Sequence, residues 1–204
     1  MLSWEKFEEF LKLFKEGKTT PYGVIRLKSL KRGRFAEEYN LDLSLEGESL
    51  LTLKVFLGRK PYYSEWIEVF GIKPKLRNEI SFFGSPLEEA LLDAITPYFS
   101  RVFIEYFEDK ETARELQKGV PPSLSRLGSK LLKRGYTYFR DWYIPEGLME
   151  GGHKIQAEKP KNEELKEKHL QKILEEYKEF KRKCSDEELV KKIEIRAKEL
   201  LRNL

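Results

Sequence analysis

Apolar positions recur along this chain with two periods, one typical of helices and one typical of strands. The first residues carry a helical stripe that Gly17 ends, and the run 22–30 that follows reads as a strand. Two runs then alternate apolar and polar residues, 41–45 and 51–57, and "EGES" between them predicts a hairpin turn. A fourth strand is expected over 65–72. The pattern therefore predicts one helix followed by four mainly antiparallel strands.

Helices and strands then alternate. "GSPLEEALL" begins a helix in which Ser85 is the cap, Pro86 suits the first position and Glu88 completes a capping box. The run 101–107 is apolar on both faces except for Glu105, which is typical of a central strand. Two further helices and two further strands are expected, over 110–118, 121–135, 136–144 and 153–158. A strand–helix–strand unit inside a meandering sheet predicts a mixed α/β (α+β) fold with helices flanking the sheet.

The composition changes after residue 160. One apolar stripe at helical spacing covers 170–180, and Ser185 is the expected cap of a second helix. These residues predict a C-terminal helical hairpin, so we expect a mixed-sheet domain over 1–160 and a helical extension over 161–204. Short helices are marginal by themselves in water, so the hairpin should pack on the core or across a homodimer.

Composition and charge narrow the classes of function. The 204 residues carry 39 basic and 35 acidic groups, and neither end of the chain forms a basic block, so nucleic acid is an unlikely partner. The single cysteine, Cys184, excludes an internal disulfide and a cysteine-cluster metal site. The charged N-terminal residues do not resemble a signal peptide, and no run approaches the roughly 20 apolar residues of a membrane span. We expect a cytoplasmic protein without a membrane partner, and the Lys/Glu-rich composition is common in thermophiles.

A family resemblance enters at "LSRLGSKLLKRGYTYFRDWYI". This run is similar to the last core helix of the GNAT superfamily of N-acyltransferases, with its Gly135-Tyr136 ending and the strand after it. The order of elements over about residues 20–159 resembles that superfamily as well. The stretch from "GVPPSLSRLG" to "DWYIPEGLMEGGHK" is also similar to an uncharacterised prokaryotic family. The resemblance implies a mixed, mainly antiparallel sheet, an acetyl- or other acyl-coenzyme A donor and an acceptor with an amine.

The resemblance also suggests residues for this chemistry. In the superfamily the acyl thioester inserts between the two central strands, which here carry Glu68 and Glu105. A carboxylate among aromatic residues loses hydration, which suits a general base, although a structural pair with an arginine is the alternative. On the last core helix, Arg126 and Lys130 are candidates for the coenzyme phosphates. The alternative is that this basic stripe is a solvated helix face, which is the more common explanation. Gly128 indicates a close approach by a ligand or by the sheet, and tight packing of the helix on the sheet is the commoner reason.

Two features depart from the superfamily pattern. Its glycine-rich pyrophosphate loop is replaced by "FFGSP", which offers Gly84. The Asn and Tyr often found in its last helix are Leu124 and Leu131 here, so the usual general acid is missing from its usual place. An acyltransferase would therefore need another acid, and Tyr143 is the candidate.

Rare residue types gather in "RDWYIPEGLMEGGHK", residues 140–154. An aromatic wall and a glycine-containing loop with several charged groups are typical of a site, because loops often carry function. A wide turn with an aromatic plug is the alternative. The residues expected to bind an amine-bearing substrate are Arg140, Asp141, Trp142, Glu146, Glu150 and His153. A metal is not expected, since His153 and His169 share no ligand-like spacing.

Three hypotheses follow. The first is an N-acyltransferase that uses an acyl-coenzyme A and a small amine-bearing substrate. The second is a non-catalytic ligand-binding module that retains the fold. The third assigns the function to the C-terminal helices, as an oligomerisation or partner-binding arm. The missing glycine loop favours the second and third, and the clustered polar residues favour a site.

Overall fold

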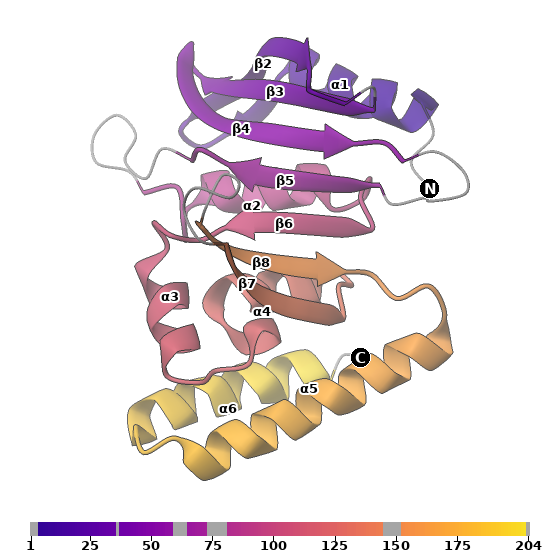
Figure 1. Ribbon diagram of the computed structural model, residues 1–204. Coiled ribbons are helices and arrows are strands. Elements are labelled where there is room, and N and C mark those ends of the chain that lie inside the picture. Colours follow the sequence, from indigo (N-terminus) through magenta and orange to yellow (C-terminus); the bar gives the residue numbers. More distant parts are fainter. Residues whose placement is uncertain (1–3, 36, 59–64, 73–80, 145–151, 203–204) are drawn as a thin grey trace. The chain divides into compact units, whose positions relative to one another are not determined.

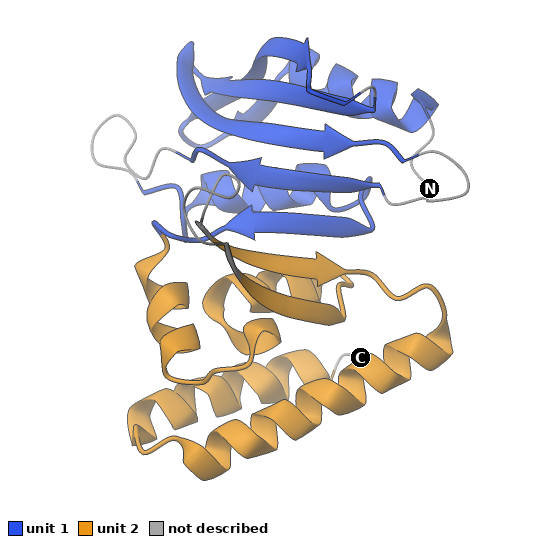
Figure 2. Cartoon of the chain, in the orientation of Figure 1, with its two compact units in different colours: residues 1–108 blue, residues 109–204 orange. Residues whose placement is uncertain are grey.

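The computed structural model describes residues 4–35, 37–58, 65–72, 81–144 and 152–202. The chain divides into two compact units, residues 1–108 and 109–204 (Figure 2). Each unit combines helices with strands that are mainly antiparallel, so the predicted mixed α/β class is confirmed. The division differs from the expected one at residue 160. The C-terminal helices share a unit with residues 109–160, because their apolar stripes are buried there.

Unit 1 is a sheet of six strands with two helices. The helices are α1 (Trp4–Glu16) and α2 (Pro86–Ile95). The strands follow one another in space as they do in sequence: β1 (Lys18–Thr20), β2 (Gly23–Arg32), β3 (Glu38–Leu45), β4 (Glu48–Phe56), β5 (Trp66–Phe70) and β6 (Arg101–Glu105). All pairs are antiparallel except β5 with β6, which α2 connects as a parallel crossover.

The register of unit 1 separates an apolar face from a polar one. Leu41 lies opposite Leu53 and Val55 opposite Ile67, and all four side chains are buried. Both helices lie on this apolar face (Figure 1). The helix α1 buries one stripe against it, made of Phe7, Phe10, Leu11 and Phe14. We call this the closed face of the sheet, and the other its open face.

Unit 2 contains helices and one antiparallel strand pair. In chain order its elements are α3 (Lys110–Gln117), the 3-10 turn η2 (Pro122–Leu124), α4 (Arg126–Lys133), β7 (Tyr138–Ile144), β8 (Gly152–Glu158), α5 (Glu163–Lys183) and α6 (Glu187–Leu201). Aliphatic side chains of α5 and α6 pack with Val120, Leu124 and Leu132 in one buried cluster. The hairpin therefore buries its apolar stripes inside its own unit.

Local backbone chemistry corrects two details of the prediction. The expected helix over 121–135 divides, because prolines begin a separate turn and Ser125 is extended at ψ 164°. The Ser125 hydroxyl then caps α4 by accepting from the Gly128 amide. The expected cap at Ser185 is one residue early. Asp186 caps α6, and its carboxylate accepts from the Leu189 amide.

Candidate functional site

The open face of unit 1 carries aromatic and charged side chains where a merely solvated sheet face would carry small polar ones. Residues of alternate parity on β3 to β6 share this face, because side chains alternate across a strand. They include Glu38, Asn40, Asp42, Thr52, Lys54, Phe56, Trp66, Glu68, Phe70, Phe103 and Glu105. Neither helix of the unit lies over them (Figure 1). Most of these side chains are half-buried.

Glu68 lies at the middle of this face. In the register it is opposite Lys54 on β4 and Phe103 on β6, and it is only 8% exposed. Glu105, half-buried, lies two residues beyond Phe103 on the same side of β6. The register thus places the two carboxylates that we suggested as bases on the same face of neighbouring strands. The residues opposite Glu68 are a cation, Lys54, and an aromatic residue, Phe103.

Aromatic rings form a continuous surface beside Glu68. Phe56 stacks on Trp66 with ring centres 5.5 Å apart, and Trp66 meets Phe103 edge-on at 5.7 Å. The Lys54 ammonium lies 5.4 Å from the centre of the Phe70 ring and 3.9 Å from the Glu38 carboxylate. An ammonium group of the protein is therefore already held here between a ring and an acid. Strand alternation placed Trp66 and Phe70 with Glu68 in the sequence, although we did not predict them.

The second predicted region is the β7–β8 pair. The Arg140 guanidinium lies 3.6 Å above the Trp142 ring, and the indole nitrogen donates to Gln156 at 2.5 Å. Gln156 donates in turn to Glu158. These residues share one face of the pair, so Trp142 is fixed from both sides. Asp141 is exposed and has the opposite parity.

The register separates residues that we expected in one cluster. His153 pairs with Tyr143, whereas Trp142 pairs with Lys154, so His153 and Trp142 lie on opposite faces. Lys154 is buried, a feature that its exposed-looking sequence context did not indicate. Glu146 and Glu150 lie outside the described residues, and so does the side chain of Tyr143. The expected arrangement of the loop around an amine stays a prediction.

The residues suggested for coenzyme phosphates have structural contacts. The Arg126 guanidinium forms a buried ion pair with Asp109, with Nη2 at 2.5 Å from Oδ2. A Cβ on Gly128 would overlap the Pro122 carbonyl oxygen, so the glycine permits α4 to pack against η2. The close approach that Gly128 indicated is therefore made by the backbone of η2, and not by a ligand or the sheet as we expected. The half-buried Lys130 accepts from Arg134 through its carbonyl oxygen.

The start of α2 does not fit a pyrophosphate either. Helix N-termini bind phosphate through free N–H groups. Here the Gly84 amide donates to the Glu88 carboxylate, the Leu87 amide to the Ser85 hydroxyl, and Pro86 has no N–H. The Ser85 and Glu88 amides donate to the carbonyl oxygens of Phe82 and Ser85. The amides of residues 84–88 are thus all occupied, and a carboxylate stands among them.

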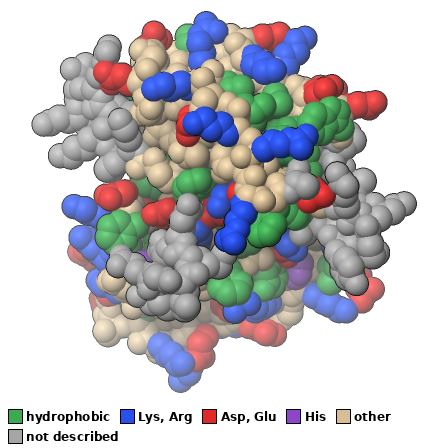
Figure 3. Space-filling model, turned by 45° about the horizontal axis from the view of Figure 1, so that its top comes forward, with side chains coloured by type: hydrophobic (Ala, Val, Ile, Leu, Met, Phe, Trp, Pro, Cys, Tyr) green, Lys and Arg blue, Asp and Glu red, His purple; other side chains and the backbone are tan. Residues whose placement is uncertain are grey.

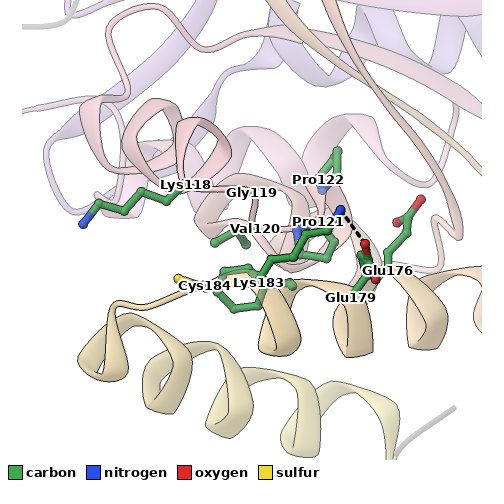
Figure 4. Close-up of a pocket in the computed structure, with 10 residues that line it drawn as sticks. Lys118, Gly119, Val120, Pro121, Pro122, Glu176, Glu179, Lys183 and Cys184 are labelled. Carbon is green, nitrogen blue, oxygen red and sulfur yellow. Dashed lines mark ion pairs between the residues drawn. The ribbon is translucent and has the colours of Figure 1, made fainter.

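Unit 2 contains a separate cavity of about 370 Å³ between the α3–η2 connection and α5. Figure 4 shows Pro121 and the Lys183 chain across its floor, with Glu176 and Cys184 towards opposite ends. Burial raises the pKa of Glu176, and the charge of nearby Lys172 partly offsets this rise. Lys183 is held by Glu179, at 2.5 Å. Most charged groups of this cavity thus have partners, Lys183 in Glu179 and Lys118 in Asp186.

Several titratable groups gather near the start of β7. Tyr136 is fully buried, which raises the pKa of its hydroxyl well above the usual range. Burial lowers the pKa of Lys159, whose ammonium lies 5.3 Å from the Tyr136 ring centre. His169 shares a hydrogen bond of 2.9 Å with the Thr137 hydroxyl, and burial lowers its pKa. These groups belong to the attachment of α5 to the strand pair.

Two broader findings limit the kinds of partner. On the surface that the space-filling view shows, basic and acidic side chains are interspersed with hydrophobic ones (Figure 3). Within the described ranges, no helix has the length and hydropathy to cross a bilayer. The same ranges contain no group of three or more His, Cys, Asp or Glu side chains arranged to hold a metal ion.

Comparison with known proteins identifies a family. The model of a family described as "Protein of unknown function (DUF1122)" matches residues 22–184, so this chain belongs to the DUF1122 family. A solved structure, "Protein of Unknown Function AQ1966 from Aquifex aeolicus VF5", is 60% identical with a TM-score of 0.90. The match covers 96% of this chain and 98% of that one. The search of curated proteins gave no match.

Two more distant structures were also found. An uncharacterised protein from Bacillus halodurans is 12% identical with a TM-score of 0.31, over 69% of this chain and 66% of that one. An acetyltransferase of the GNAT family from Streptococcus pneumoniae is 16% identical with a TM-score of 0.27, over 61% and 67%. Likenesses this weak carry no argument, so membership of the GNAT superfamily is not established.

Proposed function

We propose that this protein binds an amine-bearing small molecule on the open face of unit 1, with Glu68 and Glu105 as the carboxylates that receive the ammonium group. The observation that carries the proposal is the placement of Glu68. A carboxylate that is 8% exposed stands at the centre of a sheet face beside aromatic rings. A carboxylate attracts an ammonium group and ring faces attract it as well, so this combination favours a cationic ligand.

The aromatic surface supports the same ligand class. Trp66, Phe56 and Phe103 offer ring faces and edges within a few ångströms of one another. Ring faces attract ammonium groups, and apolar ring surface takes up the hydrocarbon part of an amine. Lys54 is an internal example, since its ammonium lies near both a ring and an acid. A ligand with an ammonium group and an apolar body matches this combination.

Acyl transfer to the bound amine is the enzymatic form of this hypothesis, and it needs a donor site. The occupied amides at the start of α2 and the Arg126–Asp109 ion pair do not supply the phosphate contacts that we expected. Binding of an amine is therefore the function that the geometry supports best. An acyl-coenzyme A donor stays a prediction.

Thermal shift with a panel of amines tests the proposal. We expect phenethylamine or n-butylamine at millimolar concentration to raise the melting temperature by mass action, and n-butanol, which has no charge, to leave it unchanged. Glu68→Gln should remove the shift. Glu48→Gln, at the exposed start of β4, is the matched control and should retain it. No shift with any amine, or an equal shift with butanol, would reject the site.

A second measurement separates binding from catalysis. Acetyl-coenzyme A is added with the amine that gives the largest shift, and mass spectrometry follows the acetylated amine. Product that depends on Glu68 would support the N-acyltransferase hypothesis. Binding without product would leave the ligand-binding module as the function.

A further inference from the structure

The strand β2 is longer than the strand that pairs with its outer side. β1 pairs with residues 23–25 only, whereas β2 continues to Arg32. Over residues 26–32 the structure describes no strand on that side. The outward N–H and C=O groups of an edge strand are a template for another strand. This edge of unit 1 is separate from the open face that we propose for an amine.

The charge along this edge has one sign. Residues 23–35 contain no acidic side chain and five basic ones, Arg26, Lys28, Lys31, Arg32 and Arg34. This local excess stands out in a chain whose total is 39 basic and 35 acidic residues. Figure 3, in which this end of unit 1 comes forward, shows Lys and Arg side chains there together with Asp and Glu side chains from other segments. A strand that pairs with this edge will therefore lie beside basic side chains of β2.

The basic residues project to both faces of the sheet. Lys31 lies opposite Asn40, whose neighbour Lys54 faces the open side, and Arg32 lies opposite Tyr39 on the closed side. Both basic side chains are exposed, as is Leu30, which shares the closed side with Arg32. A strand added here would therefore meet cations on both of its faces and an apolar side chain on one of them.

These features discriminate between possible partners. A second copy of β2 would place like charges opposite one another, which destabilises strand pairs. Lysine on an edge strand commonly prevents pairing of that kind. An acidic strand reverses the sign of the interaction and steers association. The bulge between Leu27 and Ser29 interrupts the ladder, so the continuous pairing surface is residues 29–32.

We propose that an extended acidic segment of another protein adds to β2 as a further strand along residues 29–32. Backbone hydrogen bonds give this mode its affinity, and side chains give its selectivity. The carboxylates of the added strand would meet Lys28, Lys31 and Arg32, and an apolar residue would cover Leu30. The proposal does not depend on the amine site, and each can fail without the other.

The probe is a labelled, end-blocked octapeptide of alternating Glu and Val, measured by fluorescence anisotropy at low salt. Its partner probe has the same sequence but carries N-methyl groups on every second residue, which keeps the charge and removes the N–H groups of one edge. We expect binding of the first and at least about tenfold weaker binding of the second, since main-chain bonds carry the affinity. Both measurements use the unaltered protein.

Charge reversal completes the test. Lys28→Glu with Lys31→Glu should weaken peptide binding at least about tenfold. Lys12→Glu, an exposed change on α1 of the same unit, should alter it less than about twofold because the charge is screened over distance. Circular dichroism checks that the variants fold. Equal binding of the two peptides, equally tight binding of oligo-dT, or no binding of the octapeptide would overturn the proposal.

Discussion

The two units bury acidic side chains in different ways. In unit 2, Glu115 is 3% exposed, receives Arg196 at 3.0 Å and accepts from the Arg126 amide at 2.7 Å. Asp109 holds the Arg126 guanidinium and caps α3. In unit 1, Glu68 lies instead on a strand face among aromatic rings. The acids of unit 2 thus connect helices through ion pairs and hydrogen bonds, whereas the acid of unit 1 lies within an aromatic surface.

The largest effect should come from breaking the network of unit 2. Glu115→Gln removes a buried charge that Arg196 and Lys192 face, and it leaves the largely buried Arg196 guanidinium without this carboxylate. Loss of one member of a buried ion pair costs about 3–5 kcal/mol. Chemical denaturation measures it, with Glu111→Gln as control. Glu111 pairs with Lys192 but is half-exposed, so its loss should stay within about 1 kcal/mol. Equal losses would show that burial is not what distinguishes these acids.

A substitution that leaves the charge unchanged tests the packing of α4 against η2. Gly128→Ala would place a methyl group on the Pro122 carbonyl oxygen and push α4 away from η2. Overpacking of this kind costs about 1–3 kcal/mol, occasionally more. The exposed Lys133→Ala on the same helix should change the free energy of unfolding by less than about 0.5 kcal/mol. A stable Gly128→Ala protein would mean that the close approach is not required.

The acid of unit 1 should matter less for stability than that of unit 2. Glu68→Gln keeps the shape of the side chain on the open face, and we expect a loss of less than about 1 kcal/mol in denaturant. The same variant should lose the thermal shift with amines. A loss as large as that of Glu115→Gln would instead make Glu68 a structural residue, as the alternative of a buried acid paired with an arginine requires.

The smallest effect concerns His169. Burial has the largest effect and lowers the pKa of His169. The charge of Glu158 raises this pKa, and the charge of Lys172 lowers it. The net pKa in the folded protein lies below the unfolded value of about 6.5, so the unfolded chain binds more protons in that range. The free energy of unfolding should therefore fall slightly as pH decreases below about 6.5, towards the folded pKa. His169→Gln should flatten this dependence between pH 5 and 7, measured by chemical denaturation at each pH, and a steeper slope would contradict the sign.

The sequence by itself determined the elements of this protein and their faces. Alternation at 41–45 and 51–57 predicts β3, β4 and their common apolar side, since a strand has one side-chain period wherever it lies. The capping chemistry of Ser85 and Pro86 likewise predicts the start of α2. Alternation also puts Glu68 on one face with Trp66 and Phe70, so a part of the candidate site could be read directly.

Only the tertiary structure decided what the charged and small residues do. The role of Arg126 depends on Asp109, 17 residues away, and that of Gly128 on the Pro122 carbonyl oxygen. Strand register moved His153 away from Trp142, although both lie in the segment that we expected to form one site. The helices α5 and α6 share a unit with residues 109–160 because their apolar stripes pack with Val120 and Leu132. Local sequence specifies periods and caps because neighbouring residues produce them, whereas contacts between distant segments depend on how those segments pack.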